Sequence, residues 1–205
     1  MFNKHNIEIK AKVDNPDFIR KILRELSAEF RGIDHQIDTY FKARQGRLKI
    51  REGNIENYLI YYERENKKTP KKSDLILCEI NNNLKNTFHK AFNIMCVVRK
   101  KREIYFIDNI KFHIDNVAKL GSFVEIEAMF TTPNNIDAYK QVEKFMKLFN
   151  IKNDSIIKCS YSDMLTNEIS NSYHLRILRI VDKLKNSFGT AYNQYKHFSS
   201  FFLSK

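Results

Sequence analysis

Charged side chains alternate with apolar ones in three strand-like runs between Val97 and Phe130. In a β-strand, alternate residues share one face, so each run presents a charged face and an apolar face. From the first run to the third, the charged residues are Lys100 and Arg102, then Lys111, His113 and Asp115, then Glu125 and Glu127. Clustered bases can neutralise a polyanion, and clustered carboxylates can hold a divalent cation through oxygen ligands. This combination is typical of metal-assisted phosphate chemistry.

Two earlier stretches alternate in the same way. One contains Asn6, Glu8, Lys10 and Lys12, and the other contains Arg47, Lys49 and Arg51. Reaction at one phosphorus of a triphosphate spreads negative charge over its oxygens, so an enzyme needs bases as a clamp and acids for the cation. The candidate phosphate-binding bases are Lys10, Lys12, Arg47, Lys49, Arg51, Arg64, Lys100 and Arg102. The candidate metal ligands are Glu8, Asp115, Glu125 and Glu127, and oxygen ligands of this kind suit Mg²⁺ or Mn²⁺.

The charged faces have two ways of being accommodated. They can be the solvated outer faces of an antiparallel sheet, or they can line the lumen of a closed barrel whose apolar exterior is covered by helices. Amphipathic helices are predicted after Pro16 and over residues 136–149, and the first has an apolar stripe of Phe18, Ile22 and Leu26 with Ile19 and Leu23 beside them. We therefore favour an α+β fold, an antiparallel β-barrel with a charged lumen and helices outside. A barrel of internal ion pairs without a ligand is less favoured, because buried ion pairs stabilise proteins poorly.

The rest of the first 165 residues supplies further strands and connections. Residues 35–52 are predicted to form two strands around a turn at Gln45 and Gly46, and residues 58–63 and 75–80 two more. The stretch ENKKTPKKSD, residues 65–74, is predicted to be a basic loop. Residues 81–92 are predicted to be a loop with a short helix, and residues 155–165 a short apolar segment.

Composition limits the class of protein. A chain of 205 residues can form one substantial core, and its 36 Lys and Arg against 24 Asp and Glu favour a polyanionic partner. Cys78, Cys96 and Cys159 have no metal-ligand spacing and suit a reducing compartment, and no apolar run is long enough for a membrane span. We expect a cytoplasmic protein without an integral membrane segment. Five glycines leave little room for a phosphate-binding glycine-rich loop, and zinc-protease and serine or cysteine hydrolase motifs are missing.

Several spaced motifs resemble one known family. They are NIEIKAKV, HQIDTYFKARQGRLKIRE, LIYYER followed by PKKSD, VVRKKREIYFIDNIKFHID, LGSFVEIEA and CSYSDML, in this order from about residue 4 to residue 166. Together they resemble the CYTH or triphosphate tunnel metalloenzyme family, and most of all its class IV adenylyl cyclase branch. The resemblance implies an eight-stranded antiparallel tunnel that binds a triphosphate with Mg²⁺ or Mn²⁺. It also implies a CYTH domain over residues 1–166.

The resemblance assigns roles to individual residues. The family signature Glu-x-Glu-x-Lys falls on Asn6, Glu8 and Lys10, so Asn6 departs from it with an uncharged amide. The implied catalytic residues are Glu8, Lys10, Asp115 and Glu125, with Glu8, Asp115 and Glu125 at the metal and Glu127 as a further candidate. Arg51, Arg64, Lys100 and Arg102 are implied to bind phosphate. The alignment with the family's motifs is looser at four further basic residues, Lys12, Arg47, Lys49 and Lys72.

Three functions are compatible with such a tunnel. The first is a class IV adenylyl cyclase-like lyase that converts ATP to cyclic AMP and pyrophosphate. The second is a triphosphatase acting on an inorganic, thiamine or nucleoside triphosphate, and product identity separates the two. The third is a catalytically impaired module that binds nucleotide or polyphosphate. We expect no nucleic-acid partner, since aromatic residues are not interleaved with exposed bases in the central strands. A homodimer is left open.

Residues 167–205 lie outside the resemblance and are predicted to be a basic, aromatic-rich helical extension. Ile177, Ile180, Val181 and Leu184 have helical spacing, and the segment holds six Lys or Arg against two acids, a net charge of +4. The extension is either a packing helix with a frayed end or a basic amphipathic surface for an anionic membrane or a partner.

Overall fold

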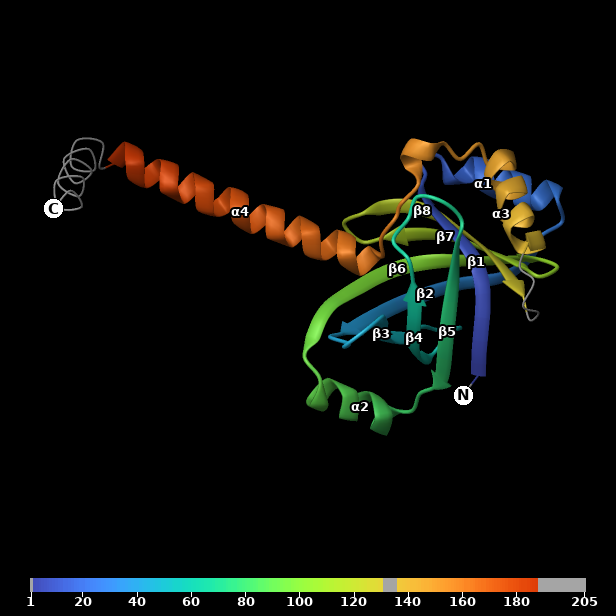
Figure 1. Ribbon diagram of the computed structural model, residues 1–205, viewed down its shortest axis with the longest axis horizontal. Coiled ribbons are helices and arrows are strands. Elements are labelled where there is room, and N and C mark those ends of the chain that lie inside the picture. The colour runs from blue at the N-terminus through green and yellow to red at the C-terminus, as the bar shows by residue number, and fades with distance from the viewer. Residues whose placement is uncertain (1, 131–135, 188–205) are drawn as a thin grey trace. The chain divides into compact units, whose positions relative to one another are not determined.

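The computed structural model describes residues 2–130 and 136–187 (Figure 1). The strands are β1 Phe2–Lys12, β2 Glu29–Phe41, β3 Arg47–Glu52, β4 Tyr58–Arg64, β5 Lys71–Glu79, β6 Ile94–Ile107, β7 Ile110–Val117 and β8 Gly121–Phe130. The helices are α1 Pro16–Glu25, α2 Asn82–Ala91, α3 Ile136–Leu148, the 3-10 helix η1 Asn153–Ser155 and α4 Tyr161–Ser187. The chain forms two compact units, Met1–Leu165 and Thr166–Lys205.

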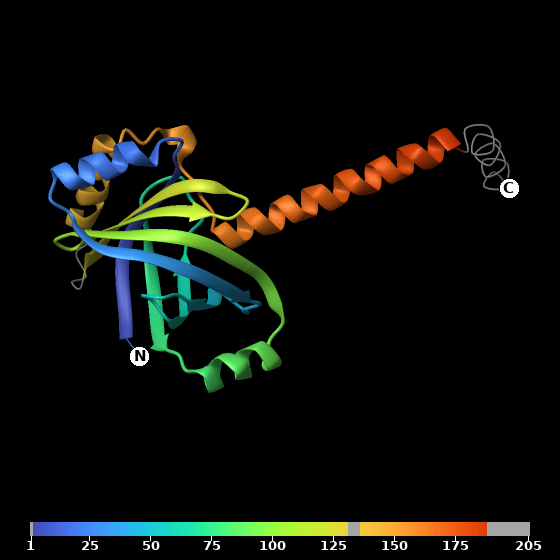
Figure 2. The same ribbon diagram turned by 180° about the vertical axis from the view of Figure 1, so that it is seen from behind.

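The eight strands form one closed antiparallel barrel in the order β1-β5-β4-β3-β2-β6-β7-β8 (Figure 2). The barrel closes at β1, which pairs with β5 on one side and with β8 on the other. Glu8 is thereby opposite Lys71 of β5 and Glu127 of β8. The predicted α+β fold and closed barrel are confirmed.

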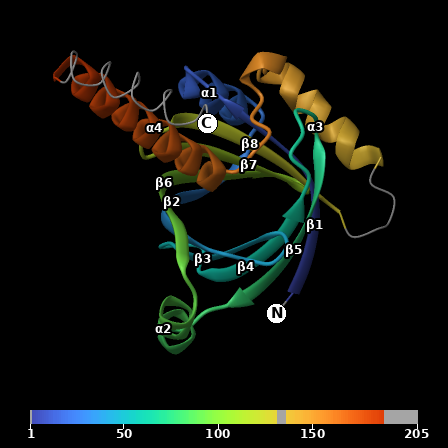
Figure 3. The same cartoon turned by 60° about the vertical axis from the view of Figure 1, so that its left-hand side comes forward.

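The alternating sequence explains why helices cover one side of the barrel. The apolar residues of β1, β7 and β8 form a buried core with α1 and α3, which lie over the same side of the barrel (Figure 3). The Phe112 ring of β7 is fully buried, with its centroid 4.7 Å from that of Phe145 and 5.6 Å from that of Phe149. Helix α1 begins as predicted, since the Asn15 side chain accepts a hydrogen bond from the Phe18 amide and Pro16 is the first helical residue.

The basic loop predicted over residues 65–74 is shorter in the structure. Strand β5 already begins at Lys71, and Ser73 pairs with Asn6 of β1 and with Arg64 of β4. Lys71 is fully buried, and its amine donates hydrogen bonds to the carbonyls of Lys67, Ile157 and Lys158. Composition misleads here because Ser73 lines the lumen and Lys71 is buried by its hydrogen bonds to three carbonyls.

A second core cluster includes the first turn of α4. Tyr161 and Leu165 are buried against residues of β6 and β8, among them Val98 and Phe123. The predicted apolar segment 155–165 therefore consists of the end of η1, a connection that bridges Ile156 to Ala11, and the start of α4. In residues 2–130 and 136–187, no helix is long and apolar enough to cross a membrane.

Phe112→Ala is expected to lower the free energy of unfolding by about 3–5 kcal/mol, because it leaves a cavity between β7 and α3. Chemical denaturation followed by circular dichroism measures this change. Phe18→Ala on α1 is the matched control, since Phe18 is exposed, and should cost on the order of 1 kcal/mol or less. Equal losses in the two variants would contradict the packing of α3 against β7.

Candidate functional site

The lumen of the barrel contains a cavity lined by the alternating charged faces. Of the predicted bases, Lys10, Lys49, Arg51, Arg64, Lys100 and Arg102 line it. Of the predicted acids, Glu8, Glu125 and Glu127 line it. These residues come from β1, β3, β4, β6 and β8, so barrel closure brings together side chains that are far apart in the sequence.

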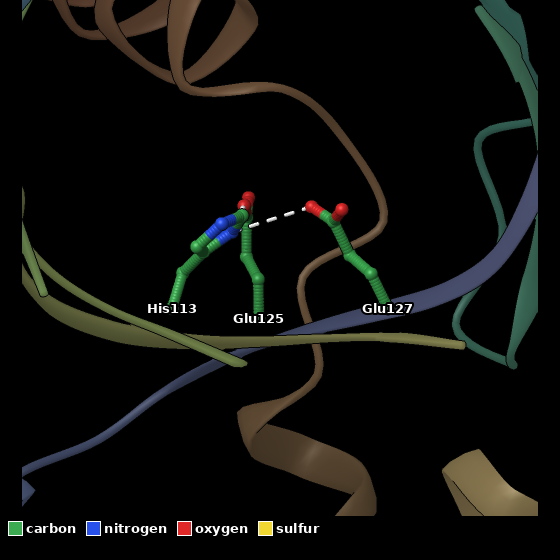
Figure 4. A group of neighbouring side chains, drawn as sticks. All are labelled: His113, Glu125 and Glu127. Carbon is green, nitrogen blue, oxygen red and sulfur yellow. Dashed lines mark hydrogen bonds and ion pairs between the residues drawn. The ribbon is translucent and has the colours of Figure 1, made fainter. Parts of the chain in front are cut away.

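One cluster in the lumen has the composition of a metal site. His113, Glu125 and Glu127 each offer one ligand atom, and these three atoms lie within 4.8 Å of one another (Figure 4). His113 is opposite Glu125 in the pairing of β7 with β8, and its Nδ1 lies 3.3 Å from Glu125 Oε2 and 3.3 Å from Glu127 Oε1. Burial raises the pKa of Glu127, but His113 outweighs it through charge and a hydrogen bond, and the net pKa is about 2.

Bases hold the carboxylates of this cluster in the ionised form. Lys10 Nζ lies 2.9 Å from Glu125 Oε1, and Arg102 Nη2 donates to Glu125 Oε2 at 2.6 Å. Burial opposes ionisation, yet Lys10 and Arg102 keep the pKa of Glu125 well below its usual range. Glu8 forms an ion pair with Arg64.

Asn6, the departure from the family signature, contacts the same cluster. It is buried, and its Nδ2 donates to Glu127 Oε2 at 3.3 Å. Among the described residues, Asn6 Oδ1 and His113 Nε2 are buried atoms without a hydrogen-bond partner. Carboxylate and amide oxygens and an imidazole nitrogen are all suitable ligands for a divalent cation. The residues around Glu127 therefore fit a divalent metal, with His113 in the place of one expected carboxylate.

Asp38 is the centre of a second ionic cluster, which was not predicted. Lys49, Arg51 and Lys100 all donate to its carboxylate, at 2.7 to 3.0 Å. Burial would raise the pKa of Asp38, but these three bases hold it well below its usual range. A signal was present, because Asp34, Gln36 and Asp38 share one face of β2.

Glu56 is a further unpredicted lining residue, from the turn between β3 and β4. It accepts from Arg51 Nη1 at 2.7 Å and from Lys111 Nζ at 2.6 Å. The turn is fixed by buried Asp34, which accepts from the amides of Ile55 and Glu56 at 3.0 and 3.1 Å. A Cβ on Gly53 would lie 2.4 Å from Asp34 Oδ1, so this close approach requires glycine. Periodicity has no signal for a charged residue on a turn.

Tyr161, from the first turn of α4, lies against the bases at the lumen. Its ring centroid is 3.5 Å from Lys10 Nζ, and its hydroxyl donates to Asp115 Oδ2 at 2.8 Å. The motif CSYSDML contains this residue but gave it no role. Burial and the charge of Asp115 raise the pKa of Tyr161 well above its ordinary value, so its hydroxyl stays a hydrogen-bond donor.

Three predicted site residues lie outside the cavity lining. Asp115 is fully buried, and its oxygens accept from Arg102 at 2.6 and 2.5 Å, so it supports Arg102 and does not belong to the metal cluster. Lys12 is exposed at the end of β1, beyond the bridge from Ala11 to Ile156. Arg47 is paired with Asp163 of α4 at 2.7 Å. Alternation assigned the face of each strand correctly but not the ends of the lumen.

Comparison with known proteins agrees with this geometry. The family model described as CYTH domain matches residues 4–161. A protein of Methanocaldococcus jannaschii named "Putative adenylate cyclase MJ0240" is 28% identical over 77% of this chain and 97% of its own length. The solved structure of the PH1012 protein of Pyrococcus horikoshii is 26% identical, with a TM-score of 0.66 over 77% of this chain and 98% of that one.

The solved structure of a "putative adenylate cyclase" from Vibrio parahaemolyticus shares the fold. Its TM-score is 0.65 at 15% identity, over 80% of this chain and 98% of that one. The fold, the charged lumen and the match over most of the sequence lead to one conclusion: this chain belongs to the CYTH family.

Proposed function

We propose that this protein is a divalent-metal-dependent enzyme that acts on a triphosphate inside the tunnel, with a reaction of the class IV adenylyl cyclase kind. The observation that carries the proposal is the lumen itself, where six predicted bases line the same cavity as the cluster of His113, Glu125 and Glu127. Such a lumen supplies both the cationic clamp and the metal ligands that reaction at a triphosphate needs.

The cluster around Asp38 supports binding of several phosphates. Lys49, Arg51 and Lys100 share one carboxylate, so each can exchange a bond to Asp38 for one to a phosphate oxygen. Burial lowers the pKa of Lys100 to about 8, against the opposing charge of Asp38. A bound phosphate would raise that pKa and favour the charged amine.

The cavity also has a surface suited to a nucleoside. Ile60, Tyr62, Leu75 and Leu77 contribute to its lining beside the bases. Apolar and aromatic side chains can contact a ribose and a base, which inorganic triphosphate lacks. This lining favours a nucleotide substrate.

In the proposed reaction, the ribose 3′-hydroxyl of ATP attacks the alpha phosphorus. The bond from that phosphorus to the oxygen that bridges to the beta phosphate breaks, the proton of the hydroxyl passes to solvent water, and pyrophosphate leaves. A cation held by His113, Glu125 and Glu127, with Asn6 Oδ1 beside them, would polarise the phosphate oxygens. Lys10, Arg64 and Arg102 neutralise charge on the phosphates, and Asp115 and Tyr161 orient Arg102 and Lys10.

The reaction is tested by product analysis with ATP and, separately, tripolyphosphate, in Mg²⁺ or Mn²⁺. The wild type is expected to give cyclic AMP and pyrophosphate, and Glu125→Gln to lose at least about 100-fold in rate because it removes a ligand and a charge. Asp17→Asn, on the exposed side of α1, is the matched control with unchanged rate. Orthophosphate as the product would assign a triphosphatase, and no product from either substrate would overturn the enzyme proposal.

Asp38→Asn tests whether the bases around Asp38 bind phosphate. It leaves three buried cations without their shared carboxylate, so it should lower the free energy of unfolding by about 3–5 kcal/mol. Tripolyphosphate should raise the melting temperature of this variant by more than that of the wild type, because it replaces the lost charge. Asp17→Asn should cost about 1 kcal/mol or less. The assignment fails if tripolyphosphate stabilises both proteins equally.

His113→Ala tests the metal ligands directly, through the electron paramagnetic resonance of bound Mn²⁺. The wild type should show the pulsed-resonance modulation of a coordinated imidazole nitrogen, and His113→Ala should lose it and bind Mn²⁺ at least about tenfold more weakly. His35→Ala is the control, because that residue is exposed on β2 and absent from the cavity lining. If the modulation from a coordinated imidazole nitrogen persists in His113→Ala, this residue is excluded as a ligand.

A further inference from the structure

Helix α4 continues along the sequence past the end of the barrel unit. Its first turn belongs to the unit Met1–Leu165, and its remaining residues, up to Ser187, belong to the second unit. The CYTH match ends at residue 161, so most of α4 has no part in the family's tunnel. The triphosphate chemistry leaves this segment without a function.

Large apolar side chains are exposed on the part of α4 that belongs to the second unit of the chain. They are Leu175, Ile177, Leu178, Ile180 and Val181, which are 57%, 58%, 45%, 51% and 39% exposed. Apolar residues thus occupy five of the seven positions from 175 to 181, and only Arg176 and Arg179 interrupt them. Contiguous exposed apolar side chains of this kind mark an interaction surface.

The two arginines fall on one side of the helix. Residues three apart are neighbours on a helix surface, so Arg176 and Arg179 share a narrow basic face. At about 100° per residue, the five apolar residues occupy the remaining arc, which is more than half of the circumference. Residues 175–181 of α4 therefore form an amphipathic stretch, with a wide apolar face and a basic face.

From this pattern we infer that the part of α4 in the second unit of the chain is a peripheral docking surface for an anionic membrane. A wide apolar face can enter the boundary between headgroups and acyl chains while the bases of the polar face contact anionic headgroups. The charge is complementary, because residues 167–205 carry a net +4 within a chain of net +12. The inference does not depend on which reaction the tunnel performs.

A second copy of the chain fits this surface less well than a membrane. A two-stranded coiled coil buries about two residues in seven, whereas residues 175–181 hold five apolar ones in seven. Leu175 and Leu178 would stay exposed outside a seam built on Ile177 and Ile180. The net positive charge of the segment would also repel an identical segment.

The test is co-sedimentation of the full chain with lipid vesicles, either of phosphatidylcholine alone or of phosphatidylcholine with about one third phosphatidylglycerol. The wild type is expected to bind the anionic vesicles at least tenfold more tightly than the neutral ones. Ile177→Ser with Ile180→Ser should weaken that binding at least tenfold without a change of charge. Arg176→Gln with Arg179→Gln should weaken it too, and more at low salt than at high salt.

The matched control is Met95→Ser with Val97→Ser, an exposed apolar pair on β6. It should leave vesicle binding unchanged, while circular dichroism confirms that every variant is folded. Vesicle binding that is absent, or equally strong in the Ile177 and Ile180 variant, would overturn the inference. Loss of a dimer in light scattering by that variant, with vesicle binding intact, would assign the surface to a second copy instead.

Discussion

Charges inside a narrow barrel must be neutralised within it, because taking an ion out of water costs several kcal/mol even after relaxation. The carboxylate of Asp38 pairs with three bases and that of Glu56 with two. The carboxylate of Glu125 pairs with Lys10, Arg102 and His113. The ionic networks thus neutralise the buried charges of the lumen within the chain itself. Under the proposed function, each of these groups also contains a base that can exchange its carboxylate partner for a phosphate oxygen.

The same constraint sets requirements on residues that hold the charged lining in place. Asp34 fixes the turn that carries Glu56, and Gly53 leaves room for the Asp34 carboxylate. Tyr161 reaches the lumen from the start of α4 and joins Lys10 to Asp115. These residues position the lining, so a change at one of them acts on the site through its neighbours.

Most of the barrel could be predicted because strand periodicity is a local property of the sequence. Alternation in β1, β3, β6, β7 and β8 indicated which face is charged, and Lys10, Lys49 and Arg102 lie in the lumen as expected. Alternation shows which face of a strand a residue is on but not its position along the barrel axis. Lys12 and Arg47 were therefore predicted to line the lumen, although the lumen ends before them. Glu56 was not predicted because it lies on a turn, and Asp38 was not predicted although it shares a polar face of β2 with Asp34 and Gln36. Their roles depend on partners that only the closed barrel brings close.

Closure at β1 has a consequence for how the protein is made. The first strand of the chain pairs with β8, so Lys10 and Glu125 meet only after nearly all of the barrel sequence has been synthesised. Until β8 leaves the ribosome, β1 lacks one of its two neighbours, and the acids and bases of the lumen lack several of their counter-ions. Contacts between segments so distant in sequence form slowly, because a long loop must be closed before they stabilise the chain. Closure of this barrel is therefore confined to the last stage of its synthesis, and a nascent chain that stalls before residue 121 carries an open strand edge.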